Sequence, residues 1–163
     1  SNSAGIVAFP EAPGNWVRPG IMLYGSSPRS DKTAAELDLR PVMQLRSRLI
    51  GINQRKKGDR VGYGSLWQCP EDMPVGVVGI GYGDGYPRHA AQGTPVWLNG
   101  MRTQILGRVS MDMLTIDLRG VDHAQRGDEV VLWGREVDVD EVAEHAQTIA
   151  YQLLCNVSGC RAG

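Results

Sequence analysis

From Pro41 onward the sequence alternates between apolar and polar residues, and this period of two constrains the fold more than any other feature. If residues 41–49 are extended, the two sides of the chain differ in polarity. One side carries Met43, Leu45, Ser47 and Leu49, and the other carries Gln44, Arg46 and Arg48. Successive side chains of a β-strand point to opposite faces, so the pattern predicts a half-exposed strand. Such a strand is typical of an antiparallel sheet.

Further short apolar stretches follow, each bounded by turn residues such as Gly, Asn or Asp. The predicted strands are residues 75–81, 94–98, 101–106, 107–118 and 128–133. The dipeptide Asn99-Gly100 lies between two of them and is a strong signal for a β-hairpin. Several short strands with such turns predict a compact, mainly β domain from about residue 39 onward.

One stretch near the C-terminal end predicts a helix. Asp138, followed by Glu141 three residues later, forms a helix-capping pattern. The apolar residues that would share one helical face are Val142, Ala143, Ala146, Ile149 and Ala150. We expect this helix near residues 139–155, with an interruption near Thr148.

The first 40 residues have a different character. The turn Arg18-Pro19-Gly20 precedes a short apolar run, Ile21-Met22-Leu23-Tyr24, which is bounded by glycines and predicts a buried strand at the end of residues 15–25. Residues 26–40 are polar and predict a linker. We therefore divide the chain into residues 1–38 and residues 39–163.

Composition excludes several classes of partner. The formal net charge is −1 and the sequence pI is about 6.3, which leaves no basic footprint for nucleic acid or an anionic membrane. There is no apolar run of membrane-spanning length and no signal peptide, so we expect a cytoplasmic protein. Because the sequence does not start with Met, we expect it to begin inside a longer polypeptide.

The cysteines and histidines predict no metal site. Cys69, Cys155 and Cys160 contain no CxxC pair and do not cluster with the histidines, so we expect free thiols in a reducing compartment. The three histidines are isolated polar residues in turn or helix contexts and are expected to be exposed: His89, His123 and His145.

A glycine-rich stretch, residues 79–88, is the first candidate for chemistry. Glycine occupies every second position through Gly85, and two tyrosines and Arg88 supply polar groups that would suit a small anionic ligand. As a pattern alone it is more simply a tight turn between strands. Tyr63 and Tyr82 each lie between two glycines, and each is equally well read as a phenol projecting into a cavity or as an aromatic packed on the sheet.

Four stretches taken together resemble the second half of alanine racemase, a pyridoxal-phosphate enzyme. They are residues 17–25 (VRPGIMLYG), 61–64 (VGYG), 79–88 (GIGYGDGYPR) and 107–113 (GRVSMDM). The resemblance covers nearly the whole chain. It implies the last part of an α/β (TIM) barrel followed by a C-terminal β-barrel-like domain.

By this resemblance Tyr63 is one of two catalytic bases and reaches from one subunit into the barrel of its partner. Racemisation removes the α-proton on one face of an amino acid and returns it on the other, so a base is needed on each side. A phenol ordinarily has a pKa of about 10, so the role requires positive charge nearby. Met111, through its backbone N–H, and Tyr82 would bind the substrate.

The resemblance also implies cofactor-binding residues. Arg18 would face the pyridine nitrogen of pyridoxal 5′-phosphate and keep that nitrogen unprotonated; otherwise it is a surface cation before a turn. The cofactor phosphate would be held by the side chain of Ser3, the amides of Gly20 and Ile21, and the hydroxyl of Tyr151. The entrance to the site would be lined by Arg88, Arg108 and Ile149, together with Tyr82 and Tyr151.

The expected function is therefore interconversion of L- and D-alanine by a homodimer, supplying D-alanine for peptidoglycan or serving alanine catabolism. The lysine that anchors the cofactor in the family is missing, since Lys32, Lys56 and Lys57 lie in polar linker or turn sequence. We expect this chain alone to be inactive and to expose sheet edges. The alternatives are a non-catalytic β module or degraded copy that uses the racemase dimer surface, and, less favoured, a related decarboxylase.

Overall fold

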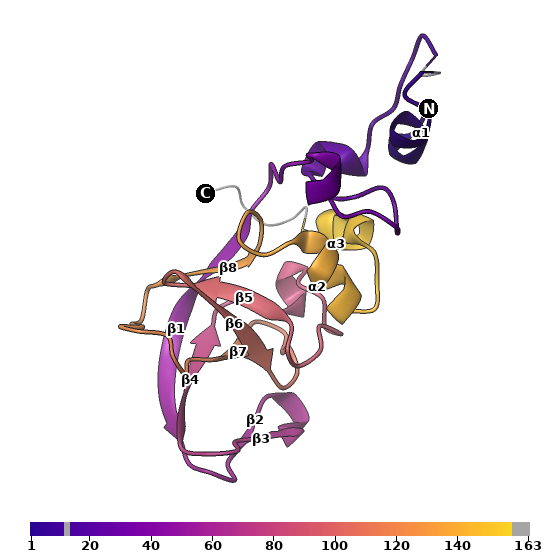
Figure 1. The fold of residues 1–163 in the computed structure, drawn as a ribbon. Helices are drawn as coiled ribbons and strands as arrows, with labels where there is room; N and C mark the ends of the chain where they lie inside the picture. Colours follow the sequence, from indigo (N-terminus) through magenta and orange to yellow (C-terminus); the bar gives the residue numbers. More distant parts are fainter. Residues whose placement is uncertain (12–13, 158–163) are drawn as a thin grey trace.

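The protein is built around a closed barrel of six antiparallel strands, in the order β1-β4-β7-β6-β5-β8 (Figure 1). In the computed structural model, residues 1–11 and 14–157 are described. The barrel strands are β1 (Leu45–Arg55), β4 (Met73–Val78), β5 (Pro95–Leu98), β6 (Met101–Leu106), β7 (Leu114–Asp117) and β8 (Glu129–Trp133). The predicted mainly β fold is confirmed. The predicted exposed edges are wrong for these six strands, because closing the barrel pairs every one of them on both sides.

Strand β1 closes the barrel because it is long enough to pair with two neighbours. Its first part pairs with β8, Leu45 opposite Trp133, and its second part pairs with β4, Asn53 opposite Val75. Leu45 and Leu49 are buried while the arginines between them are exposed, as the alternation predicted. The register shifts once in each pairing, as expected where a strand bends around a barrel.

The hairpin between β5 and β6 forms where the sequence predicted it. Asn99 and Gly100 both have positive φ, 48° and 81°, which a two-residue hairpin turn with this twist requires. Leu98 pairs with Met101 across the turn. Asn can adopt this conformation at low cost and Gly at none, so these two residues determine the position of the turn.

The barrel interior and two helices share one apolar core. The fully buried side chains include Leu49, Leu98, Ile105, Ile116 and Leu132. Helices α2 (Val139–His145) and α3 (Ala150–Asn156) add Val142, Ala143 and Leu153 to it. The chain breaks between the helices near Thr148, as predicted. Tyr86 stacks on Trp133 in this core with ring centroids 5.8 Å apart, and burial raises the pKa of its phenol.

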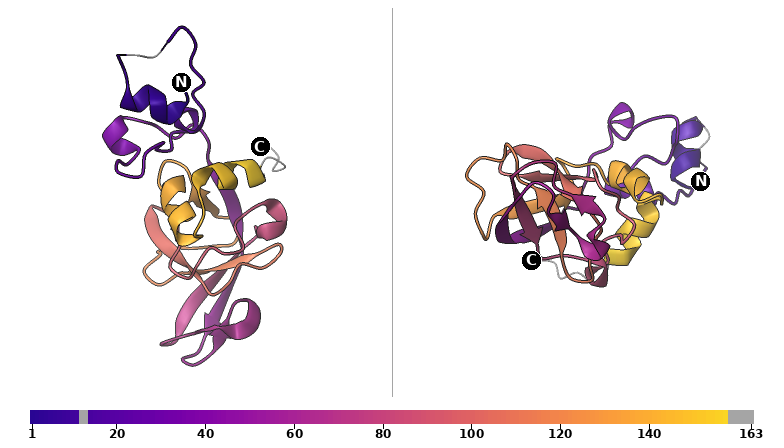
Figure 2. Two further views of the ribbon diagram at one scale, coloured as in Figure 1. Left: turned by 90° about the vertical axis from the view of Figure 1, so that its right-hand side faces the viewer. Right: turned by 90° about the horizontal axis from the view of Figure 1, so that it is seen from below.

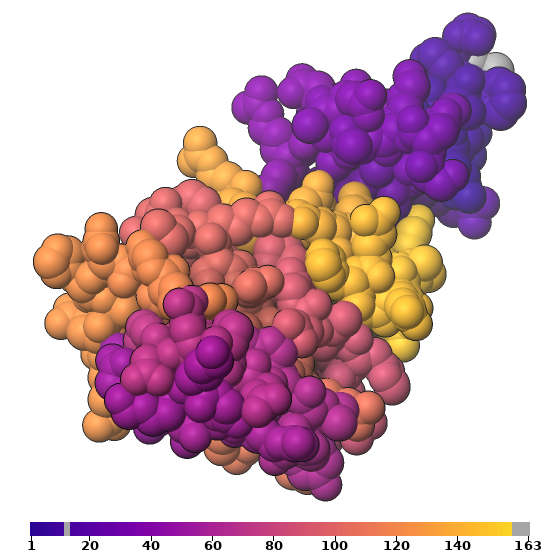
Figure 3. All heavy atoms as spheres, turned by 60° about the horizontal axis from the view of Figure 1, so that its bottom comes forward, coloured from indigo at the N-terminus to yellow at the C-terminus, as the bar shows by residue number. Residues whose placement is uncertain are grey.

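A two-stranded hairpin, β2 (Arg60–Val61) and β3 (Trp67–Gln68), lies outside the barrel sheet and carries the turn η3 (Tyr63–Ser65). It has an apolar cluster of its own, formed with the ends of barrel strands: Val61, Trp67, Cys69, Met73, Val75 and Leu106. Figure 3 views the molecule from the side on which this hairpin lies. Packing in this cluster fixes the position of the hairpin at the end of the barrel.

The terminal segment lies beside the barrel and projects away from it (Figure 2). It contains α1 (Ser3–Ala8), η1 (Ile21–Tyr24) and η2 (Ala35–Leu37). The predicted strand at residues 21–24 is wrong, because these residues form a 3-10 turn closed by Gly25 at φ 81°. A Cβ on Gly25 would lie 2.3 Å from Arg40 backbone atoms, so the chain folds back here instead of extending. The boundary between residues 38 and 39 stays a prediction.

The prediction of one strand over residues 107–118 is also wrong, since only β7 (Leu114–Asp117) is extended. Gly107 has φ 68°, and the N–H of Ser110 donates to the carbonyl of Met113 at 2.9 Å. A turn at Ser110 therefore replaces the first half of the strand. Elsewhere, the thiols of Cys69 and Cys155 are free, His89 and His123 are exposed, and His145 is half-buried; Cys160 lies outside the described residues.

We expect Leu49→Ala to lower the free energy of unfolding by about 2–5 kcal/mol, because the side chain is completely buried and its removal leaves a cavity between β1 and β4. Urea denaturation followed by tryptophan fluorescence measures this. Val42→Ala, on an exposed side chain, is the control and should change it by less than about 0.5 kcal/mol. Equal effects would contradict the assigned core.

Stability should also fall in acid through Asp117. Burial disfavours its carboxylate, but hydrogen bonds from Arg119, one of them 2.6 Å long, outweigh burial and hold the pKa of Asp117 below its ordinary value. A lowered folded-state pKa gives stability that is present above the unfolded pKa of about 3.9 and is lost as the pH falls through the folded pKa. Asp117→Asn should lower the melting temperature at pH 7 and flatten the acid dependence, while the exposed Asp122→Asn should do neither.

Candidate active site

Tyr63 lies on the turn of the β2–β3 hairpin with its ring 64% exposed. Gly62 and Gly64 on either side have φ of 81° and 77°, conformations that glycine adopts without strain. Val61 and Trp67, at the two ends of the turn, are buried in the hairpin's own cluster. The exposed Tyr63 is therefore carried by a hairpin that is packed on the barrel, and it is not an aromatic packed on the sheet.

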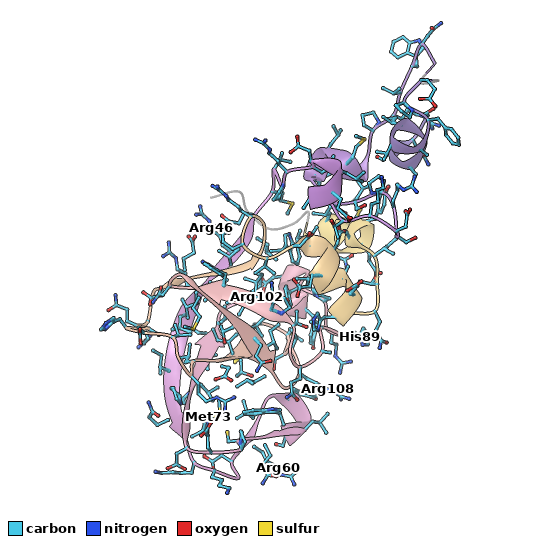
Figure 4. All side chains as sticks on the ribbon, viewed as in Figure 1. Arg46, Arg60, Met73, His89, Arg102 and Arg108 are labelled. Carbon is cyan, nitrogen blue, oxygen red and sulfur yellow. The ribbon has the colours of Figure 1, made fainter. Side chains whose placement is uncertain are left out.

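The Tyr63 turn packs directly on the backbone that leads to Arg108. A Cβ on Gly62 would lie 3.0 Å from the amide nitrogen of Arg108, and a Cβ on Gly107 would lie 2.9 Å from the carbonyl oxygen of Val61. Gly62 and Gly107, which both have positive φ, are thus in close backbone contact. Figure 4 labels Arg108 on the side of the barrel where the hairpin lies.

The glycine-rich loop, residues 79–88, joins the same region through its backbone. The N–H groups of Tyr82 and Gly83 donate to the carbonyls of Ser110 and Met111 at 3.0 and 2.7 Å. A Cβ on Gly81 would lie 2.3 Å from the Ser110 oxygen, so only glycine permits this approach. The stretch forms a 3-10 turn, η4 (Tyr82–Asp84), between strands. This shape is compatible with both interpretations of the sequence, a simple turn and a ligand-binding loop.

The position of Met111 is compatible with a role as a backbone hydrogen-bond donor. Its carbonyl is occupied by Gly83, while within residues 1–11 and 14–157 its N–H finds no acceptor. Its side chain is 61% exposed, which answers the alternative that Met111 belongs to the core. The N–H is thus available to a carboxylate.

Tyr82 and Arg88 lie together, with the guanidinium 5.9 Å from the centre of the tyrosine ring. This is a cation–π contact. Arg88 separates two hollows, one of about 490 Å³ that also contacts Tyr82 and Gln152, and one of about 400 Å³ that reaches Arg108 and Leu66. Tyr63, Tyr82, Arg88, Arg108 and Met111 therefore belong to one connected group of loops.

A second group forms beside helix α3. The hydroxyl of Ser3 accepts a hydrogen bond from the N–H of Gly20 at 2.7 Å, and a Cβ on Gly20 would lie 3.8 Å from that hydroxyl and 4.0 Å from Cε1 of Tyr151. Ile21 follows with its side chain buried in the core. The fold thus brings together residues that are predicted to share a phosphate site, although they lie up to 148 positions apart in the sequence.

Arg18 and Ile149 lie at the margins of this second group. Arg18 is exposed, and its N–H donates to the carbonyl of Ser1 at 2.7 Å, which aligns it with the start of α1. Ile149 is the exposed residue immediately before α3, two positions from Tyr151. The functional roles assigned to all these residues remain predictions.

Sequence reasoning missed one residue that shapes the first group. The carboxylate of Asp84 accepts a hydrogen bond from the N–H of Gly81 at 2.9 Å and so fixes the start of the turn that holds Tyr82. The signal was available, because an aspartate three residues after the first residue of a turn is a capping pattern. Among the described residues no cluster could hold a metal ion, and no helix has the length and apolar character needed to cross a bilayer.

The fold and its loops define a class of protein. Loops that leave a rigid scaffold and bear polar groups are where binding and catalytic residues usually lie. The chain is a closed β-barrel domain with several such loops in contact.

Comparison with known proteins identifies the family. The family described as "Alanine racemase, C-terminal domain" matches residues 42–161. An alanine racemase of Coxiella burnetii (strain CbuG_Q212) is 56% identical over 162 residues, covering 96% of this chain and 44% of the relative, and one of Piscirickettsia salmonis is 54% identical over 156 residues, covering 96% and 94%. The chain belongs to the alanine racemase family.

Solved structures of alanine racemases are similar over nearly the whole chain. The biosynthetic alanine racemase from Pseudomonas aeruginosa has a TM-score of 0.92 at 48% identity, covering 97% of this chain and 44% of that protein. Alanine racemase from Acinetobacter baumannii has a TM-score of 0.92 at 45% identity, covering 99% and 45%. The chain therefore spans a little under half the length of most of these relatives.

We expect Gly107→Ala to displace the Tyr63 turn, because the new Cβ would meet the Val61 carbonyl at 2.9 Å. Amide shifts of Tyr63 and Gly64 in 15N NMR spectra should change, and stability should fall by more than about 1 kcal/mol. Gly127→Ala is the matched control, since Gly127 also has positive φ but its Cβ would meet nothing within 4 Å. It should leave the Tyr63 shifts unchanged; changes in both variants would contradict the contact.

Proposed function

We propose that this chain is the C-terminal part of a pyridoxal-phosphate-dependent alanine racemase that interconverts L- and D-alanine. The observation that carries the proposal is the similarity to solved racemases over 97–99% of the chain. Because the chain spans under half of those proteins, the proposed activity belongs to an assembly that also contains the cofactor-anchoring lysine.

The second group fits the phosphate of pyridoxal 5′-phosphate. It combines hydroxyls of Ser3 and Tyr151 with the start of the turn η1. The N–H of Gly20 donates to the Ser3 hydroxyl and so holds that hydroxyl in place, while the N–H of Ile21 has no acceptor among the described residues. Successive backbone N–H groups at a glycine turn favour an anion.

When bound, the cofactor withdraws electrons from the amino acid and makes its α-proton removable. This chain's proposed part is to hold or move that proton and to fix the substrate. The exposed phenol of Tyr63 would take or return the proton on one face, and the Met111 N–H would bind the substrate carboxylate. Arg18 would face the cofactor ring with a permanent charge.

The proposed active form is a homodimer. Tyr63 is exposed on the turn of the β2–β3 hairpin, and we propose that its ring enters the pocket of a second subunit. Arg88, Arg108 and Ile149, all exposed, would then line the entrance for alanine.

Mixing this chain with a separately produced cofactor-binding barrel of an alanine racemase should restore racemisation, measured by the appearance of D-alanine from L-alanine and of the reverse product. With Tyr63→Phe the rate should fall by about 10²–10⁴-fold, because one proton-transfer group is lost. Tyr24→Phe removes a phenol outside the site and is the control.

Two outcomes would count against the proposal. Normal rates in both directions with Tyr63→Phe would exclude this tyrosine as a base. A mixture that assembles by size-exclusion chromatography yet does not racemise alanine would favour a non-catalytic β module.

A further inference from the structure

The proposed phosphate site is assembled from two separate parts of the chain. Ser3, Gly20 and Ile21 belong to the terminal segment, whereas Tyr151 belongs to α3 of the barrel domain. The two parts meet closely, since a Cβ on Gly20 would lie 4.0 Å from the Tyr151 ring. A small displacement of one part relative to the other would therefore separate the groups that bind the phosphate.

A single carboxylate joins these two parts. The hydroxyl of Ser26 donates to Oδ1 of Asp140, and the N–H of Ser27 donates to Oδ2 at 2.9 Å. Ser26 is completely buried. Among the described residues, these are the two hydrogen bonds that connect residues 1–40 with residues 41–157, and both end on Asp140.

Near this contact a surface hollow separates the two parts, although Ser26 itself is completely buried. A hollow of about 730 Å³ lies between the terminal segment and the helices, with Ser26 and Asp140 in its wall together with Tyr151. Apolar contact between the parts comes from Ile21, buried in the barrel core. Hydrogen bonds to an ionised group are stronger than those between neutral groups.

Short, internally bonded segments connect Asp140 and its partners to the phosphate site. From Ser26 back to Gly20 the chain is held by Leu23 N–H to the Gly20 carbonyl and Gly25 N–H to the Met22 carbonyl, at 3.0 and 3.1 Å. From Asp140 forward, α2 is tied to the start of α3 by Thr148 N–H to the Ala143 carbonyl at 2.9 Å. The carboxylate is thus connected to both sides of the site through short hydrogen-bonded segments.

We propose that Asp140 is a positioning residue that aligns the two halves of the phosphate site, through Ser26 and Ser27 on one side and α2–α3 on the other. The inference rests on the proposed function, in that the aligned groups are taken to bind phosphate. It goes further by assigning the alignment to a residue that touches neither cofactor nor substrate.

A simpler role for Asp140 must be separated from this one. An acidic residue in the first turn of a helix stabilises that helix whatever it contacts. In that case Asp140→Ala would lower stability without changing phosphate affinity, and its effect would add to that of Ser26→Ala. If Asp140 aligns the site, both variants weaken phosphate binding and their effects overlap.

The test uses the complete 163-residue chain labelled with 15N and titrated with inorganic phosphate, pyridoxal 5′-phosphate and, as the phosphate-free comparison, pyridoxal. The amide signals of Gly20 and Ile21 report binding. Asp140→Ala should weaken binding of both phosphate compounds by about tenfold and leave pyridoxal unaffected. Ser26→Ala should weaken it too, and the double variant should be no worse than Asp140→Ala.

Controls separate misfolding from misalignment. Glu144→Ala removes the same charge from an exposed position on α2 and should leave binding unchanged. Unaltered amide signals from the barrel strands show that a variant is folded. If Asp140→Ala fails this criterion, Asp140→Asn, which keeps the shape but loses one acceptor, takes its place with the same expected result.

Two results would overturn the inference, and they differ. Phosphate affinity unchanged in Asp140→Ala but weakened in Ser3→Ala and Tyr151→Phe would remove the alignment role and leave the phosphate site standing. Affinity unchanged in all of these variants, or no response of Gly20 and Ile21 to phosphate, would overturn the phosphate site itself and the inference with it.

Discussion

Closure of the barrel by β1 is the constraint on which the rest of the structure depends. This strand pairs with β8 at its start and with β4 at its end, so the sheet has no free edge among its six strands. Closure fixes where each loop leaves the barrel. The Tyr63 hairpin, the Arg108–Met111 loop and the glycine-rich loop can therefore meet at one place although they are distant in sequence.

Backbone contacts, more than side-chain contacts, hold those loops together. Gly62 against Gly107, and Gly81 against Ser110, approach more closely than any residue with a Cβ allows. The side chains of Tyr63, Arg108 and Met111 are therefore not needed to hold the loops together, and they stay exposed. This division suits a site in which polar groups must face a ligand while their support stays rigid.

The sequence predicted the barrel strands well because their signals are local. Alternation identified β1, although the strand begins four residues later than predicted and runs six residues further, to Arg55, and Asn99-Gly100 placed the β5–β6 turn at the correct residues. The prediction of strands was wrong at residues 21–24 and 107–113, where apolar residues had suggested them. There, positive-φ glycines and close contact with Arg40 or Gly81 decide the backbone, and such contacts between distant segments leave no periodicity in the sequence.

The candidate site residues were suggested by resemblance and not by pattern. Composition offered no reason to connect Ser3 with Tyr151, or Tyr63 with Met111, because their proximity arises only on folding. Ser26 and Asp140 escaped notice for the same reason. A serine in a polar linker and an acid at a helix start are each ordinary, and only the folded chain joins them.

The hairpin that carries Tyr63 shares its apolar cluster with the barrel strands β4 and β6, through Met73, Val75 and Leu106. Detaching the hairpin would expose apolar side chains of the barrel itself, which costs free energy. The phenol is therefore held at one position by the same contacts that close this end of the barrel against water.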